Sequence, residues 1–134
     1  MKMRHFTLQE LTASPTAALH GLDNTPPCEA ERHLEALVEQ VLDPLREAWG
    51  GPIYVTSGYR CPALNRLVGG VEGSQHTLGQ AADITAGKPA DNQRLLRLIK
   101  RLRLPVDQVI DERHGTWLHV SHGPRNRKQF LHIP

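Results

Sequence analysis

Apolar residues recur at helical spacing in two parts of the chain. The first series predicts an amphipathic helix over residues 29–49, and its apolar positions are Leu34, Leu37, Val38, Val41, Leu42, Leu45 and Trp49. Pro44 lies inside this series, and we expect a kink there because proline lacks a backbone N–H and clashes with the preceding turn. Gly50-Gly51 should end the helix. The second series predicts a helix over residues 92–102, capped by Asp91, with Leu95, Leu96, Leu98, Ile99 and Leu102 as its stripe.

Shorter patterns predict the remaining elements. Thr7 and Glu10 form a capping box, so a short helix should begin at Leu8, and Ser14-Pro15 should close it. Another turn of helix is expected within residues 61–68. Segments rich in β-branched and aromatic residues predict strands at residues 53–57, 81–84, 107–112, 116–121 and 130–133. The third and fourth of these should form a hairpin around His114-Gly115, and the last should be an edge strand.

The order of these elements indicates the fold class. Helices come first and most strands later, which favours an α+β fold: a small antiparallel sheet with helices packed on one side. With 134 residues and no internal repeat or low-complexity tract, the whole chain, residues 1–134, is expected to be a single domain. By size it is expected to be a monomer.

Composition narrows the possible partners. A formal charge of +2 is too small to indicate nucleic acid binding. Cys28 and Cys61 form no CxxC pair, so we expect two free thiols. No apolar stretch has the length of a membrane span or a signal peptide, so we expect no membrane insertion and synthesis in the cytoplasm without a signal peptide.

Three residues are candidate metal ligands. His76 and Asp83 lie in one segment whose intervening residues are mostly small, and His119 lies in a predicted strand beside Trp117, which could shield a metal from bulk water. Two histidines and one carboxylate are what a catalytic zinc ion takes, with water in the fourth position. The alternative is that these are ordinary surface or hydrogen-bonded residues, since the chain has 8 histidines. We interpret the set as the site of a zinc-dependent peptidase.

A zinc peptidase also needs a general base, and two carboxylates are candidates. If His114-Gly115 is a two-residue hairpin loop, Glu112 faces Trp117 and shares a side of the sheet with His119, while Asp111 points the other way. A three-residue loop would reverse that result. We favour Glu112 as the catalytic base over Asp111.

Other polar residues are candidate substrate contacts. Arg60 follows a strand and could grip a substrate carboxylate or steady the oxyanion, or it could be a solvated arginine. Ser74 could donate a hydrogen bond to substrate or cap the turn before His76. Residues 125–128 read as a solvated basic tail, with weak contact to an anionic cell-wall polymer as the alternative.

Several motifs taken in order resemble one known family. They are Thr56-Ser57-Gly58-Tyr59-Arg60, Leu64-Asn65, Gly69-Gly70, Ser74-x-His76-x-x-Gly79-x-Ala81-x-Asp83 and Trp117-x-His119-Val120-Ser121. The set is similar to the zinc D-alanyl-D-alanine carboxypeptidases, a family that includes phage endolysins cutting the L-alanyl-D-glutamate bond of peptidoglycan. Upstream segments, from the Phe6-Thr7-Leu8-x-Glu10-Leu11 opening onward, extend the resemblance over most of the chain.

The resemblance implies a hedgehog-like α+β fold and specific roles. Zinc would be held by His76, Asp83 and His119, the base would be Glu112, and contacts to a peptidoglycan stem peptide would come from Arg60 and Ser74. Trp117, two positions before His119, is a further candidate substrate contact. One departure stands out: many relatives have a catalytic Glu three positions before the last His, where this chain has Thr116. The base must then come from the preceding strand.

Three hypotheses follow. The first is a zinc peptidase cleaving peptidoglycan stem peptides, of the D-Ala-D-Ala carboxypeptidase or L-Ala-D-Glu endopeptidase type. A phage or prophage lytic enzyme that reaches the cell wall or periplasm after holin-type or other release would fit its small size. The second is a hedgehog-like zinc-binding module that does not catalyse and serves in assembly or wall binding. The third is an α+β domain with structural histidines.

Overall fold

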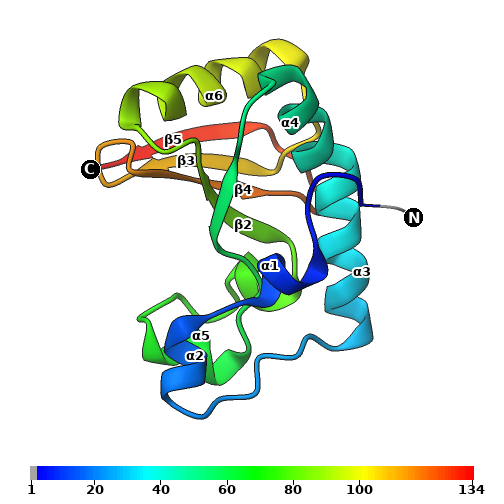
Figure 1. Ribbon diagram of the computed structural model, residues 1–134, viewed down its shortest axis with the longest axis vertical. Helices are drawn as coiled ribbons and strands as arrows, with labels where there is room; N and C mark the ends of the chain where they lie inside the picture. Colours follow the sequence, from blue (N-terminus) through cyan, green and yellow to red (C-terminus); the bar gives the residue numbers. More distant parts are fainter. Residues whose placement is uncertain (1–2) are drawn as a thin grey trace.

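The computed structural model describes residues 3–134 and has a five-stranded sheet at its centre (Figure 1). The strand order is β1-β2-β4-β3-β5, and the bounds are β1 (Tyr54–Ser57), β2 (Ala81–Thr85), β3 (Gln108–Glu112), β4 (Trp117–Ser121) and β5 (Gln129–Ile133). The expected α+β fold is confirmed. Four strands are antiparallel as predicted, but β5 pairs parallel to β3, so the sheet is mixed and the expectation of a purely antiparallel sheet is wrong for that strand.

Helices cover one face of this sheet. Figure 1 shows α6 (Pro89–Leu102) and α4 (Asp43–Trp49) above the strands, with α3 (Cys28–Leu37) upright on the right, beside the ends of the strands. Alternate residues of the strands point toward the helices, and together they form one buried core with the helix stripes; the strand contribution is Ala82, Ile84, Val109, Leu118 and Val120. Fully burying such a side chain stabilises the fold by about 1.5–3 kcal/mol. The other alternate residues therefore point to the uncovered face.

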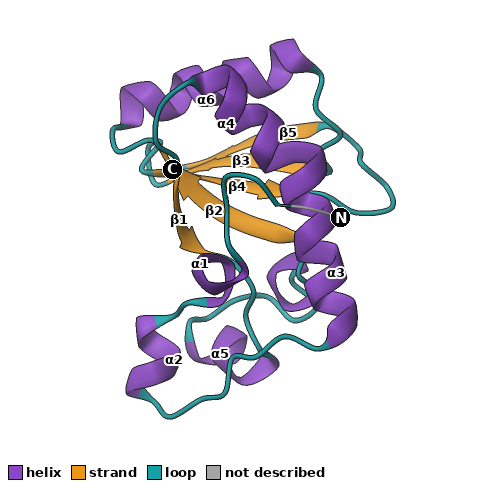
Figure 2. Cartoon of the chain, turned by 45° about the vertical axis from the view of Figure 1, so that its right-hand side comes forward, coloured by secondary structure: helices purple, strands orange, loops and turns teal. Residues whose placement is uncertain are grey.

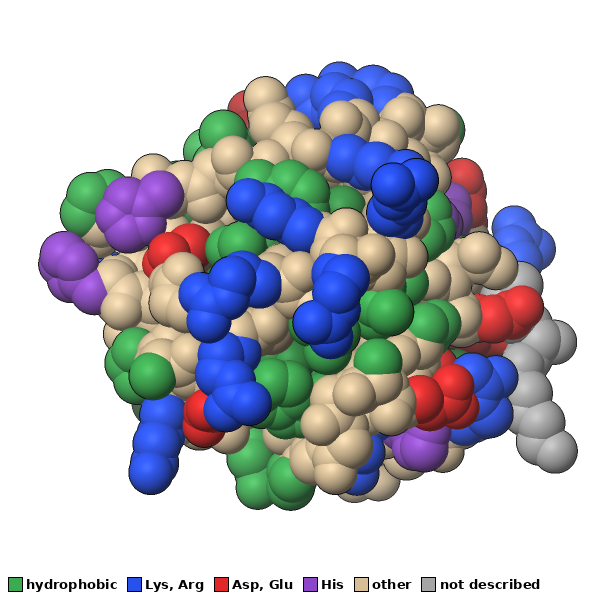
Figure 3. Space-filling view, turned by 90° about the horizontal axis from the view of Figure 1, so that it is seen from above, with side chains coloured by type: hydrophobic (Ala, Val, Ile, Leu, Met, Phe, Trp, Pro, Cys, Tyr) green, Lys and Arg blue, Asp and Glu red, His purple; other side chains and the backbone are tan. Residues whose placement is uncertain are grey.

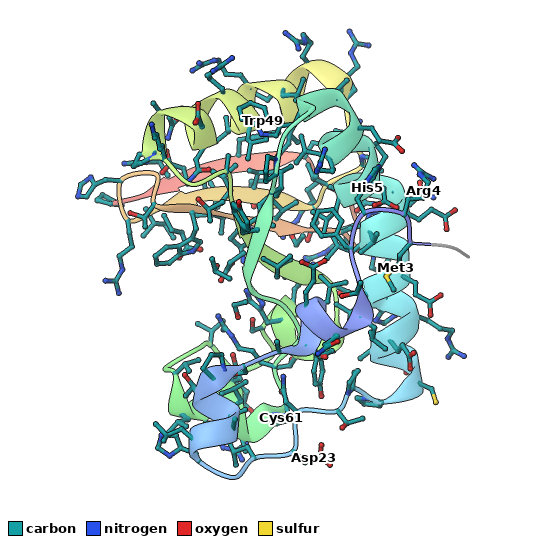
Figure 4. All side chains as sticks on the ribbon, in the orientation of Figure 1. Met3, Arg4, His5, Asp23, Trp49 and Cys61 are labelled. Atoms are coloured by element: carbon teal, nitrogen blue, oxygen red, sulfur yellow. The ribbon has the colours of Figure 1, made fainter. Side chains whose placement is uncertain are left out.

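The long helix predicted for residues 29–49 is present, with a local widening in its middle. Between α3 and α4 lies η1 (Val38–Leu42), a π-helical turn in which the Asp43 N–H donates to the Val38 carbonyl. This turn comes immediately before Pro44, which cannot donate to the preceding turn, so the predicted disturbance takes the form of a π turn. The buried Asp43 carboxylate accepts hydrogen bonds from the backbone N–H groups of Arg4 and His5 at 2.8 and 2.9 Å, which ties the N-terminal segment to the helix (Figure 4).

Short helices lie at the end of the molecule away from α6 (Figure 2). The capping box at Thr7 is confirmed and α1 (Leu8–Thr12) follows it. As predicted, α1 ends just before Ser14-Pro15, with Ala13 as its C-cap. The Ser14 hydroxyl then caps a second helix that was not predicted, α2 (Pro15–Leu19). The turn expected near residues 61–68 is α5 (Pro62–Leu67). At the other end, α6 begins at Pro89 with Lys88 as its N-cap, so Asp91 lies in the first turn and is not the cap.

The surface over α6 is rich in basic side chains, as the space-filling view shows (Figure 3). Its exposed residues include Arg94, Arg97, Lys100 and Arg101. The guanidinium of Arg94 lies 5.5 Å from the centre of the Trp49 ring, which packs between α4 and α6. Across residues 3–134, no helix combines the length and apolar character needed to span a membrane. Both Cys28 and Cys61 are free thiols, as predicted.

Candidate metal centre and catalytic cleft

His76, Asp83 and His119 come together on the uncovered face of the sheet. His76 lies on η2 (Gln75–Leu78), a single 3₁₀ turn capped by the Ser74 hydroxyl. Asp83 lies on β2 and His119 on β4, and these two residues are direct cross-strand partners. Cross-strand partners point to the same face of a sheet, so the pairing brings both side chains together. The three candidate ligands predicted from sequence therefore form one cluster.

The distances in this cluster fit a metal ion. The Asp83 Oδ1 atom lies 3.3 Å from His76 Nε2 and 3.2 Å from His119 Nδ1. A tetrahedral zinc ion with bonds of about 2.0–2.1 Å places neighbouring ligand atoms about 3.3 Å apart. One potential ligand atom from each of the three residues lies within 4.8 Å of the other two, and among residues 3–134 no other His, Cys, Asp or Glu joins the group. The side chains of His76, Asp83 and His119 are only 4%, 9% and 12% exposed, respectively.

The hydrogen-bond geometry of His76 also indicates a cation site. Its Nδ1 lies 2.7 Å from the Gly58 carbonyl oxygen, which can only accept, so Nδ1 carries the proton and the neutral ring has its lone pair on Nε2. That lone pair faces the Asp83 carboxylate, another acceptor. Two buried acceptors facing each other need a cation or a second proton between them. A backbone carbonyl that fixes the tautomer of a ligating histidine is the usual arrangement around protein-bound metals.

Asp83 stays ionised in this setting. Burial alone would raise its pKa, but the hydrogen bonds and positive charge that His119 and His76 supply when their rings are protonated outweigh burial and hold the pKa of Asp83 well below its usual range. An ionised carboxylate beside two imidazoles is a suitable donor set for a divalent ion.

Close backbone contacts position the segment that carries His76. A Cβ atom at Gly58 would overlap the Leu11 carbonyl oxygen, which accepts from Tyr59 N–H at 2.8 Å. Gly79 has φ +74°, and a Cβ there would overlap the Ala30 carbonyl at the start of α3. A side chain at Gly58 would push the end of β1 away from α1, and one at Gly79 would push η2 away from α3. The two glycines of the sequence motif thus act through packing.

We therefore expect Gly58→Ala to lower the free energy of unfolding by about 1–3 kcal/mol, the typical effect of overpacking a filled site. The added methyl group meets backbone atoms that cannot rotate away, and relief would also move the carbonyl that orients His76. Urea unfolding followed by circular dichroism measures the effect. Gly51→Ala is the matched control, because its Cβ would meet only the Trp49 side chain at 3.4 Å. Equal stability of the two variants would contradict the packing argument.

The three residues line a cleft of about 540 Å³. Its wall combines the site-facing residues of β3 and β4, the loop before η2 and the end of the chain; the lining residues are Arg60, Gly70, Val71, Gly73, Ser74, Gln75, His76, Asp83, Gln108, Ile110, Glu112, Trp117, His119, Arg125, Arg127 and Ile133. All seven site residues predicted from the sequence are in this set. A cleft this size with converging polar groups is a typical substrate site.

Comparison with known families agrees with this geometry. The profile of the family described as Peptidase M15 matches residues 4–121. The chain belongs to this family. The resemblance to zinc D-alanyl-D-alanine carboxypeptidases inferred from the motifs is thereby confirmed. Members are metallopeptidases that act on peptidoglycan and generally depend on zinc. No curated protein matches the chain.

Within this M15 peptidase, the β3–β4 hairpin decides which carboxylate faces the cleft. Glu112 pairs with Trp117 and Ile110 with His119, the register expected for the favoured loop. Glu112 lines the cleft, and its carboxylate has no ion-pair partner within residues 3–134. Asp111 points to the covered face, where its Oδ2 accepts from Gln93 Nε2 at 2.7 Å. Position 116, where many relatives have Glu, is an exposed turn residue whose hydroxyl donates to the Arg113 carbonyl.

The other predicted contacts also lie at the cleft of the M15 peptidase. Arg60 is held by Ser57 Oγ at 3.3 Å and Asn65 Oδ1 at 3.2 Å, with Nη2 at 3.7 Å from Asp83 Oδ2. It is a fixed cation beside the ligand cluster and not a solvated arginine. The Ser74 hydroxyl accepts from the His76 N–H at 3.2 Å, so it caps the turn, and the residue also lines the cleft. Trp117 forms the wall next to Glu112.

Sequence reasoning missed one part of this site. The segment predicted as a solvated basic tail is built into the cleft, with Arg125 and Arg127 among its lining residues. The cause is Asp107, whose side chain is 1% exposed and which pairs with both arginines. A lone acidic residue after the apolar pair Pro105-Val106 is the only sequence signal that could have indicated a buried partner for them.

Proposed function

We propose that this M15 peptidase hydrolyses a peptide bond in peptidoglycan stem peptides, with zinc held by His76, Asp83 and His119. The bond would be of the D-Ala-D-Ala carboxypeptidase or L-Ala-D-Glu endopeptidase type, and the whole chain would act as one catalytic domain at the bacterial cell wall. The observation that supports this most is the convergence of a two-histidine, one-carboxylate set in a cleft, in a chain that belongs to a metallopeptidase family.

Zinc in this site would supply Lewis-acid chemistry, polarising the scissile carbonyl and acidifying a water molecule. Glu112 would take the proton from the attacking water and deliver it to the leaving amine, the task of a general base that then acts as an acid. Its place in the cleft, on the same side of the sheet as His119, supports this role. Asp111 is separated from the cleft by the sheet itself.

Three residues would position the substrate. Arg60 is a fixed cation next to Asp83, suited to hold a substrate carboxylate or to stabilise negative charge on the carbonyl oxygen. Trp117 offers a flat apolar wall, with the guanidinium of Arg113 5.8 Å from its ring centre. The Ser74 hydroxyl would donate a hydrogen bond to the peptide while it accepts one from the His76 N–H, since a hydroxyl group can do both at once.

Zymography on purified peptidoglycan, with chelator and with zinc added back, tests the proposal. We expect clearing that chelator abolishes and zinc restores, and mass spectrometry of the released fragments would then identify the bond. No clearing with one zinc per chain still bound would favour the non-catalytic zinc module, to which the Thr116 departure also points. No clearing and no zinc would reject the proposed function.

A further inference from the structure

The chain segment after β4 completes the catalytic cleft. Residues 122–134 lie beyond the part of the chain that the family profile covers, yet Arg125, Arg127 and Ile133 line the cleft beside the candidate ligands. The segment is fastened along β3: Lys128 N–H donates to the Val106 carbonyl and Gln129 N–H to the Asp107 carbonyl, and β5 continues the parallel pairing. One wall of the cleft is thus formed by a segment that lies outside the matched part of the chain.

Asp107 fixes the two arginines of this wall. Its Oδ1 accepts from the Arg127 backbone N–H at 3.1 Å and from Arg127 Nε at 2.8 Å. Its Oδ2 accepts from Arg127 Nη2 and from Gln75 Nε2, both at 3.1 Å. The hydrogen bonds and charge of Arg127, with a smaller contribution from the charge of Arg125, outweigh burial and lower the pKa of Asp107 to about 2. Because Gln75 precedes His76, the same carboxylate connects the C-terminal segment to the metal-ligand turn.

This arrangement leaves one positive charge only loosely paired. Arg127 and Asp107 form a pair joined by two side-chain hydrogen bonds and neutralise each other. Arg125 Nη2 lies 3.7 Å from the same carboxylate, beyond hydrogen-bond distance, and the Arg125 side chain is 66% exposed. Arg60 on the other side of the cleft is 17% exposed and already bonded to Ser57 and Asn65. Arg125 is the cation of the cleft that is free to meet a ligand.

We propose that Arg125 binds a carboxylate of the peptide substrate on the β5 side of the cleft, so that the enzyme selects stem peptides with a free acid there. Asp107 and Arg127 are positioning residues that hold the segment carrying Arg125. A guanidinium offers a planar fork of donors that matches a carboxylate, which is why the partner is an acid. The inference rests on the proposed function, since it places a peptide in this cleft.

Synthetic stem peptides that differ at one carboxylate test the inference. Each free acid is replaced in turn by its amide, and kcat/KM is measured for the wild type and for Arg125→Gln. At one position, amidation should lower wild-type kcat/KM by about 10- to 100-fold, the range for a hydrogen bond to a charged group. For the free acid, kcat/KM of Arg125→Gln should be lower than that of the wild type by the same factor. For the amide the two enzymes should have equal kcat/KM, because amidation and the substitution each remove the same contact.

Three further variants separate loss of the Arg125 contact from general damage to the protein. Arg101→Gln is the charge-matched control: it removes an exposed arginine from α6, on the covered side of the sheet, and should behave as wild type on every peptide. Asp107→Asn should raise KM for the free acid more than for the amide, a selectivity that simple loss of stability would not produce. Arg125→Lys should recover part of the preference for the acid.

These experiments can reject the role of Arg125 without rejecting the proposed function, and the reverse. Cleavage of acid and amide peptides by Arg125→Gln at wild-type rates would overturn the inference and leave the peptidase assignment intact. If the wild type cleaves none of the peptides, calorimetry on the same set decides. Binding that needs both the carboxylate and Arg125 would uphold the inference while rejecting the peptidase assignment, and binding that needs neither would overturn the inference.

Discussion

His119→Ala is expected to remove zinc from the protein and to lower peptidoglycan hydrolysis by about 10³-fold or more. Lewis-acid stabilisation by a bound metal is worth several kcal/mol in the transition state, and each 1.36 kcal/mol is a factor of about ten in rate. The loss should be large because no other described His, Cys, Asp or Glu lies near enough to replace the missing ligand. Metal content by plasma mass spectrometry and release of peptide fragments from peptidoglycan measure the two effects.

His20→Ala is the matched control for this experiment. His20 is exposed and lies just after α2, so its removal should leave both metal content and hydrolysis at wild-type levels. If His119→Ala kept one zinc per chain and full activity, the candidate metal centre would be rejected. A thermal unfolding scan of the metal-loaded proteins would show whether a loss of folding explains any change.

Glu112→Gln should abolish most turnover while leaving zinc in place. General acid–base catalysis contributes about 10²- to 10⁴-fold, and the amide keeps the shape of the side chain but cannot hold the proton. We expect kcat to fall by that factor with one zinc per chain retained.

Asp111→Asn tests the alternative on the same strand. The Asp111 carboxylate faces α6 and accepts from Gln93, a bond that the oxygen of an asparagine side chain can keep. The variant should therefore retain turnover. Loss of activity in Asp111→Asn together with normal activity in Glu112→Gln would reverse the assignment of the base. If both variants hydrolysed peptidoglycan as fast as the wild type, the proton would be carried by another group.

Local sequence patterns determined most of the elements. The apolar series from Leu34 to Trp49 has the helical period because one side of that helix faces the core, and the capping box at Thr7 is a contact within one turn. The register of the β3–β4 hairpin could be predicted since a short loop restricts how two adjacent strands pair, and this placed Glu112 and His119 on one face. Each of these features depends on residues close together in the chain.

The tertiary structure decided what depends on distant partners. The parallel pairing of β5 with β3 joins segments that have no turn between them, so no local pattern could indicate its direction. Ser14 caps α2 through a hydroxyl that could equally have belonged to a loop. The role of residues 125–128 changed for the same reason: Arg125 and Arg127 are basic surface residues by sequence, and only the burial of Asp107 beneath them makes them part of the cleft. The sequence thus identified the candidate metal ligands and their neighbours, whereas the wall opposite Arg60 exists only because a buried carboxylate must be paired.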